Sequence, residues 1–193
     1  MKRNIALVVA LLAVALLAIP RANADGIFTA ALLGSNEVPP TGSPATGFIT
    51  VTLTGNALKV AESFSGLTAP ATAAHIHCCA DPGVNAIVAV PFTGFPSTTS
   101  GTYSNIFDLT LASTYNTAFI TANGGTAASA ESVLLAALFA GETYANIHDA
   151  TFPGGEIRGQ LAQTPEPATG GLMLLAFGMM TRKRYTQWRH RTK

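Results

Sequence analysis

The sequence has few charged residues, and those it has are unevenly placed. Only 11% of the 193 residues are charged, and nine of the eleven basic residues lie in the first 21 or the last 12 positions. Between residues 25 and 163, nine acidic residues stand against only two basic ones, Lys59 and Arg158, which gives a net charge near −7. This region lacks the basic surface with which proteins bind phosphate backbones, so we expect no nucleic-acid partner.

Recognisable catalytic motifs are also missing. The sequence has no glycine-rich phosphate loop, no nucleophile elbow and no Cys-to-His spacing of a known catalytic type. Glycosidase chemistry needs two carboxyl groups at a defined separation, and no second carboxyl can be assigned beside Glu156 from the sequence. We therefore predict a protein that is not an enzyme.

The first 24 residues have the layout of a secretory signal peptide. Two basic residues precede an unbroken apolar run over 5–19, Pro20 ends this run, and Ala22-Asn23-Ala24 supplies the small residues of a cleavage site. Because the run is short for a membrane span, we favour cleavage before Asp25 over an uncleaved anchor. The secretion machinery is thus expected to carry the protein out of the cytoplasm.

The last segment, residues 164–193, reads as a short membrane-directed tail. Pro165-Glu166-Pro167 precedes an apolar run over 168–180, and the basic cluster Arg182, Lys183 and Arg184 follows as a membrane stop. As a helix this run would be ~20 Å long, shorter than the ~30 Å hydrocarbon layer, so the bilayer must thin or flanking residues must help. The positive-inside rule places the basic cluster in the cytoplasm, in agreement with export of the preceding domain.

The order of these features resembles the PEP-CTERM sorting signal of exopolysaccharide-producing Gram-negative bacteria. The resemblance implies recognition by an exosortase, cleavage near Pro165-Glu166-Pro167, and delivery from the inner membrane to the cell surface or extracellular matrix. The long polar end after Arg184 departs from many such tails. Topology alone leaves a plain tail anchor as the alternative.

Residues 25–163 are expected to form one mainly β domain. Apolar and polar residues alternate over 48–53 and 58–64 around Thr54-Gly55-Asn56, which predicts a β-hairpin. Helical spacing indicates one short helix over 129–140 and a second over 113–121. Short strands separated by Gly, Pro and Ser favour an antiparallel sandwich or barrel; the further strands are expected at 27–33, 73–77, 86–91, 101–111, 143–148 and 156–161.

Four stretches of this domain, 33–40 (LGSNEVPP), 74–77 (AHIH), 144–148 (YANIH) and 154–160 (GGEIRGQ), resemble in their order the CHRD domain, first described in chordin. The resemblance implies an immunoglobulin-like β-sandwich or barrel found in secreted proteins of bacteria and animals. Chordin as a whole binds bone morphogenetic proteins, but no activity is established for the domain in general. The resemblance therefore predicts the fold better than the function.

Three histidines are candidate metal ligands. His75 and His77 are two residues apart on an expected strand, so their side chains leave the same face, and His148 lies on another strand. Three imidazoles that converge can bind copper or zinc. The alternative is a structural role in which these histidines cap strands and hydrogen-bond to loop carbonyls.

Two further pairs of residues stand out. Cys78 and Cys79, the only cysteines, can form a vicinal disulfide, pair with another chain or remain thiols, and we favour a disulfide over thiolate ligation of copper or zinc in an oxidising compartment. Glu156 and Arg158 are two apart on an expected strand, so a structural ion pair with each other or with a neighbouring strand is predicted.

The end of the domain is expected to close as a hairpin in which 144–148 pairs with 156–161. Ile147 and Ile157 should then lie in the core, and Asn146 and His148 should share the other face.

The leading functional hypothesis is a surface or matrix protein that binds polysaccharide, protein or itself. The second hypothesis is a metalloprotein or metal-dependent oxidoreductase that uses His75, His77 and His148.

Overall fold

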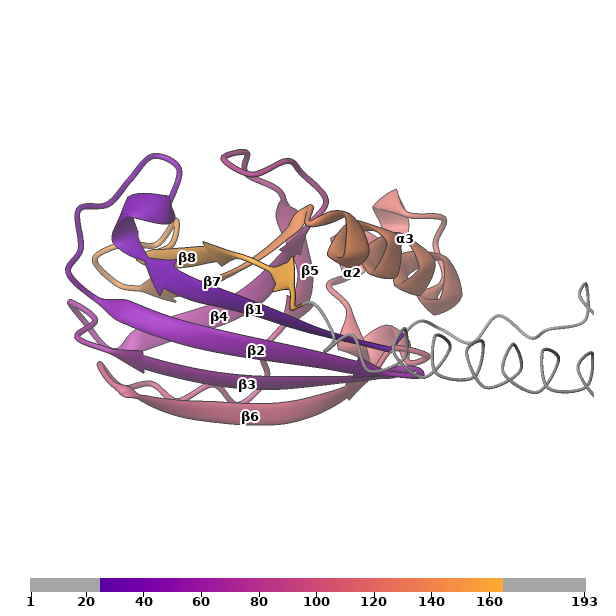
Figure 1. Cartoon of the computed structure of the whole chain (residues 1–193), viewed down its shortest axis with the longest axis horizontal. Coiled ribbons are helices and arrows are strands. Elements are labelled where there is room, and N and C mark those ends of the chain that lie inside the picture. Colours follow the sequence, from indigo (N-terminus) through magenta and orange to yellow (C-terminus); the bar gives the residue numbers. More distant parts are fainter. Residues whose placement is uncertain (1–24, 165–193) are drawn as a thin grey trace, which may run out of the picture. The chain divides into compact units, whose positions relative to one another are not determined.

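The computed structural model describes residues 25–164 (Figure 1). The predicted signal peptide (1–24) and the sorting motif, apolar run and basic cluster of the tail (165–193) lie outside the described residues. Within the described part, neither helix combines the length and the hydropathy that a membrane crossing requires.

The described chain is mainly β, as predicted, with two short helices. The strands run close to their predicted positions, although β6 ends three residues early because the Asp108 side chain accepts hydrogen bonds from Thr110 and starts a turn. The elements are β1 (Gly26–Leu33), η1 (Gly34–Asn36), β2 (Thr46–Thr54), β3 (Ala57–Ser65), β4 (Ala71–Cys78), β5 (Ile87–Pro91), β6 (Gly101–Asp108), η2 (Ala112–Thr114), α2 (Thr117–Ala122), α3 (Ala127–Ala140), β7 (Thr143–Asp149), β8 (Ile157–Gln160) and β9 (Ala162–Gln163).

The strands form one antiparallel sheet in the order β5-β4-β7-β8-β1-β2-β3-β6, with β9 also paired to β1. The sheet curls into a half-barrel (Figure 1), so of the two expected alternatives, a sandwich or a barrel, the structure has the barrel-like one. The cause lies in β1, which pairs with β2 along its whole length and with β8 at Leu33, so that no gap divides the strands into two layers. We call β2, β3 and β6 the open half of the sheet, and β4, β7 and β8 the covered half.

The concave inner face of the sheet holds the core. Alternate residues of β2 and β3 point inward, and α3 begins at a Thr126 cap that bonds reciprocally with Ser129 and ends at Gly141 in a left-handed conformation. The Phe139 ring of this helix packs edge-on against Phe28 of β1, with centroids 5.1 Å apart. The helices therefore close one end of the half-barrel; buried side chains there include Phe119, Leu134 and Leu138.

The closing hairpin pairs β7 with β8, as predicted. Ile147 of β7 pairs with Ile157 of β8, and both side chains are fully buried in the core. Asn146 pairs with Arg158, and by strand alternation both side chains leave the outer face. The hairpin therefore carries core residues on one face and polar residues on the other.

Candidate functional site

The outer face of the covered half is buried beneath two loops, residues 34–45 and 79–86. Asn36 donates to the Arg158 carbonyl at 3.1 Å, and Thr41 donates to the Glu156 carbonyl at 2.9 Å, so the first loop is tied to β8 and the turn before it. Asn85 of the second loop donates to the Val38 carbonyl of the first at 2.8 Å. These loops bring together all four stretches that carry the family resemblance and enclose a polar cluster that includes Glu37, His77, Tyr144, Asn146 and Arg158.

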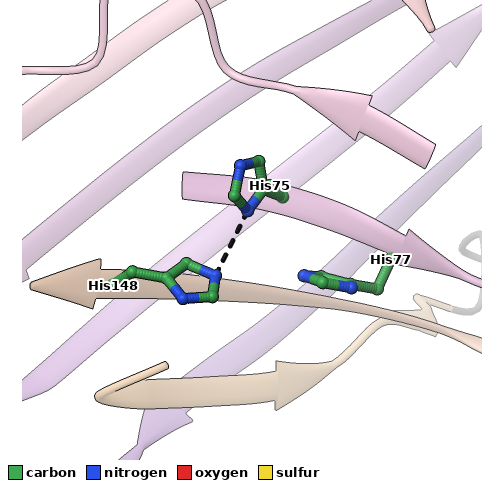
Figure 2. Close-up of side chains that lie close together, drawn as sticks. All are labelled: His75, His77 and His148. Carbon is green, nitrogen blue, oxygen red and sulfur yellow. Dashed lines mark hydrogen bonds between the residues drawn. The ribbon is translucent and has the colours of Figure 1, made fainter. Parts of the chain in front are cut away.

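The three candidate histidines meet on this face (Figure 2). His75 and His77 come from β4 and His148 from β7, and one potential ligand atom of each lies within 4.8 Å of those of the other two. Nδ1 of His75 is 3.2 Å from Nε2 of His148. His77 is buried, while His75 and His148 are partly accessible. The site thus has a buried side and an open side.

Backbone carbonyls determine which ring nitrogens carry hydrogen. Nδ1 of His77 lies 2.9 Å from the Ala86 carbonyl, and Nδ1 of His148 lies 3.0 Å from the Pro153 carbonyl. A carbonyl only accepts, so both Nδ1 atoms donate, and Nε2 of each neutral ring keeps its lone pair. Both Nε2 atoms point at Oδ1 of Asn146, each at 3.0 Å.

Burial favours the neutral form of all three imidazoles. It lowers the pKa of His75 to about 4, with the other two histidines adding to the effect. Burial is also the main cause of the lowered pKa values of His77 and His148, although their backbone hydrogen bonds oppose it. Neutral imidazoles have free lone pairs, so the rings are in the state that a metal ligand requires.

A second layer of side chains holds this arrangement in place. The His77 ring stacks on Tyr144 at a centroid distance of 4.6 Å, and the Arg158 guanidinium carbon lies 3.3 Å from the centre of the Tyr144 ring. Arg158 also donates to Asn85 Oδ1 at 3.0 Å and to the Val84 carbonyl at 2.8 Å. The buried guanidinium is therefore held by hydrogen bonds and an aromatic face.

The predicted ion pair between Glu156 and Arg158 is absent from the described part of the chain. Glu156 precedes β8, and its carboxylate accepts from the Ser43 hydroxyl at 2.6 Å and from the Thr68 N–H and hydroxyl at 2.9 and 2.8 Å. The acidic residue whose charge acts on the pKa of Arg158 is Glu37 of the first loop, and it raises that pKa. Burial raises the pKa of Glu37 to about 6, although Arg158 and the Asn146 side chain act in the opposite direction.

Gly155 leaves the space in which Glu37 and Asn146 meet. Its φ of 123° is one that side-chain-bearing residues rarely adopt. A Cβ atom at this position would collide with Oε1 of Glu37 and lie 2.7 Å from Nδ2 of Asn146. Because the Asn146 amide nitrogen faces Glu37, its oxygen is left facing the histidines.

The cysteine pair directly follows His77, and Cys78 belongs to the hydrophobic core. Cys78 and Cys79 form a vicinal disulfide, with Cys78 buried and Cys79 exposed. Of the alternatives open from the sequence, the structure therefore has the disulfide between neighbours. Its sulfurs offer no thiolate, so nitrogen and oxygen donors remain as the candidate ligands at the histidines.

Sequence reasoning found the three histidines and placed Asn146 on the same face as His148, but it did not find the other neighbours. Tyr144 lies two residues before Asn146 on β7, so the same strand alternation could have placed it on this face as well. Glu37 and Asn85 come from loops, and no periodicity in the sequence could have located them.

The half-barrel and its loop-covered polar face define an antiparallel β domain with one partly buried imidazole cluster in its described part. Residues 28–161 match the family model of the CHRD domain, and the chain belongs to the CHRD family. This membership is consistent with an extracellular or periplasmic location. No curated protein and no solved structure is significantly similar to the chain.

Proposed function

We propose that this chain is an exported protein of the cell surface or extracellular matrix whose CHRD domain acts as a binding or structural module, and not as an enzyme. The observation that carries the proposal is the combination of a signal-peptide pattern at the front, a CHRD domain in the middle and a PEP-CTERM-like tail at the end. In this proposal an exosortase cleaves near Pro165-Glu166-Pro167 and releases the domain from the inner membrane.

The geometry of the domain suits display from a membrane. Phe28 near the start of β1 pairs with Gln163 at the end of β9, so the chain enters and leaves the domain at the same place. Leu33, at the other end of β1, pairs with Arg158 of the polar cluster. At ~3.3 Å per residue, the eight residues of β1 separate the cluster from the attachment end by roughly 25 Å. A membrane-tethered domain would thus present its cluster away from the tether.

The outer face of the open half is the surface we propose for polysaccharide or protein. Phe48 on this face is 49% exposed, and it borders a shallow depression lined also by the hydroxyl-bearing residues Ser63, Thr102 and Ser104. Phenylalanine is among the residues enriched at protein interfaces, and hydroxyls can exchange hydrogen bonds with sugars.

The processing step is tested by intact-mass measurement of the surface-extracted protein from a host that has an exosortase. The expected species runs from Asp25 to near Thr164. Replacing Glu166 with Ala should leave a membrane-retained precursor, whereas Glu142→Gln, a matched loss of charge inside the domain, should be processed normally. A surface species that still contains Trp188 would contradict the proposed cleavage.

A further inference from the structure

We infer that His75, His77 and His148, together with Oδ1 of Asn146, form a binding site for one divalent first-row transition-metal ion, with copper(II) preferred over zinc. Nothing in the proposed surface role requires this site. The two proposals can therefore fail separately.

The first argument is the surplus of lone pairs inside the cluster. Nε2 of His77, Nε2 of His148 and Oδ1 of Asn146 are all acceptors, and both Nε2 atoms lie 3.0 Å from the same oxygen. Nδ1 of His75 can donate a hydrogen bond to Nε2 of His148 at 3.2 Å. No described group supplies a hydrogen for the contact between Nε2 of His77 and Oδ1 of Asn146. Buried acceptors that face each other without a donor are costly, and a cation between them removes the cost.

The alternative, a purely structural role, explains only part of this arrangement. It accounts for the Nδ1 hydrogen bonds to the Ala86 and Pro153 carbonyls. It does not account for the approach of two lone-pair nitrogens to one carbonyl oxygen.

The second argument is distance. At a metal–ligand distance of ~2.0 Å, two ligands lie ~2.9 Å apart at a right angle and ~4 Å apart on opposite sides of the ion. The observed separations of 3.0 and 3.2 Å match neighbouring ligands, and the upper limit of 4.8 Å among the histidines requires only a modest closing of the widest pair. Imidazole nitrogens with one amide oxygen suit a tetragonal copper(II) ion, which also binds most tightly in the Irving–Williams order.

The third argument is the support around the ligands. Metal-binding histidines usually donate their second nitrogen to a carbonyl or carboxylate, and His77 and His148 already do so. The amide nitrogen of Asn146 lies beside Glu37 at Gly155, so Oδ1 is left facing the rings. All four donors stand on β4 and β7, which pair with each other, so their positions are fixed by the sheet. The partly exposed His75 and His148 leave an entry for the ion.

The site is tested on the full-length chain, purified in detergent and stripped of metal with a chelator. Titration with copper(II), followed by elemental analysis and electron paramagnetic resonance, should show one ion per chain with splitting from several nitrogen ligands. Zinc should compete for the same site with lower affinity. His148→Gln should weaken copper binding by more than about 100-fold, since even second-layer changes commonly cost 10- to 100-fold. His190→Ala, which removes the histidine outside the domain, should leave binding unchanged.

Two further measurements separate loss of the site from loss of the fold. Chelator-treated His148→Gln should keep the far-ultraviolet circular dichroism of the wild type. Asn146→Asp, which makes the fourth donor a carboxylate, should bind copper at least tenfold more tightly and gain a larger increase in Tm on copper addition. Absence of stoichiometric copper or zinc in the wild type would overturn the inference, as would binding that survives replacement of all three histidines. Copper affinity in Asn146→Asp no higher than in the wild type would overturn the four-donor site.

Discussion

The open and covered halves belong to one sheet, yet their outer faces differ. On the open half, Ile106 is 64% exposed and Phe48 49% exposed, and their neighbours are mainly Thr, Ser and Lys. On the covered half, Asn146 and Arg158 are each only 2% exposed. Both halves share the apolar inner face that stabilises the fold. Burying polar groups on the outer face adds no such stability by itself, so the covered face points to a function.

The largest expected effect comes from comparing a substitution on the inner face of the covered half with one on the outer face of the open half. Ile157→Asp places a carboxylate in the core of the covered half and should unfold the domain, because an unpaired buried charge costs several kcal/mol against a typical stability of ~5 to 15 kcal/mol. Ile106→Asp is the matched control on the exposed face of the open half and should change the free energy of unfolding by less than about 0.5 kcal/mol. Chemical unfolding of both variants measures this, and a folded Ile157→Asp would refute the hairpin register.

The second largest effect concerns Glu62, a buried acidic residue on the otherwise apolar inner face of the open half. Glu62 is 4% exposed on the inner face, between Ile49 and Tyr103 in register, and its carboxyl oxygens have no hydrogen-bond partner among the described residues. Burial raises the pKa of Glu62 to about 8 from an ordinary 4.5. Between these values the folded state holds a proton that the unfolded state has lost, so stability falls as pH rises.

The expected decrease between pH 4.5 and pH 8 is about 5 kcal/mol from Glu62 alone. Urea unfolding at several pH values should show a slope in the wild type that is much smaller in Glu62→Gln. Ser63→Ala, on the opposite face of β3, should keep the wild-type slope. Equal slopes in the wild type and Glu62→Gln would show that Glu62 is not buried as described.

A third comparison uses the two basic residues of the domain, one on each half. Lys59 is exposed on β3, so Lys59→Met should change stability by less than about 0.5 kcal/mol. Arg158→Met removes two hydrogen bonds and the contact with Tyr144, and leaves Glu37 without its nearby cation. We expect a loss of about 3 kcal/mol, measured by unfolding at neutral pH. Similar values for the two variants would contradict the distinction between the halves.

The smallest effect comes from adjacent glycines at the edge of the covered face. Gly155→Ala requires a strained φ and brings a methyl group against Glu37 and Asn146, so a loss of about 1 to 3 kcal/mol is expected. Gly154→Ala meets no atom within 4 Å and should be nearly neutral. Thermal melts of the two variants suffice, and an equally stable Gly155→Ala would mean that the turn relaxes without cost.

The sequence was most informative where local alternation determines structure. It predicted the β2–β3 hairpin, the closing hairpin with Ile147 and Ile157 in the core, and α3 to within two residues of its start. It did not predict that β1 joins both halves into one sheet, because strand order depends on contacts far apart in the chain. The hydrogen-bond partners of Arg158 could not be predicted for the same reason, because Val84 and Asn85 lie more than seventy residues away in a loop without periodicity.

The meeting of β1 and β9 has a consequence for how such a domain can be combined with others. A chain that enters and leaves at one point can be inserted into a longer polypeptide without forcing the flanking segments apart. The domain then projects from the surrounding polypeptide at this end. Its other end remains free, whatever sequence lies on either side. The fold is therefore suited to reuse as an interchangeable module in proteins of quite different length and layout.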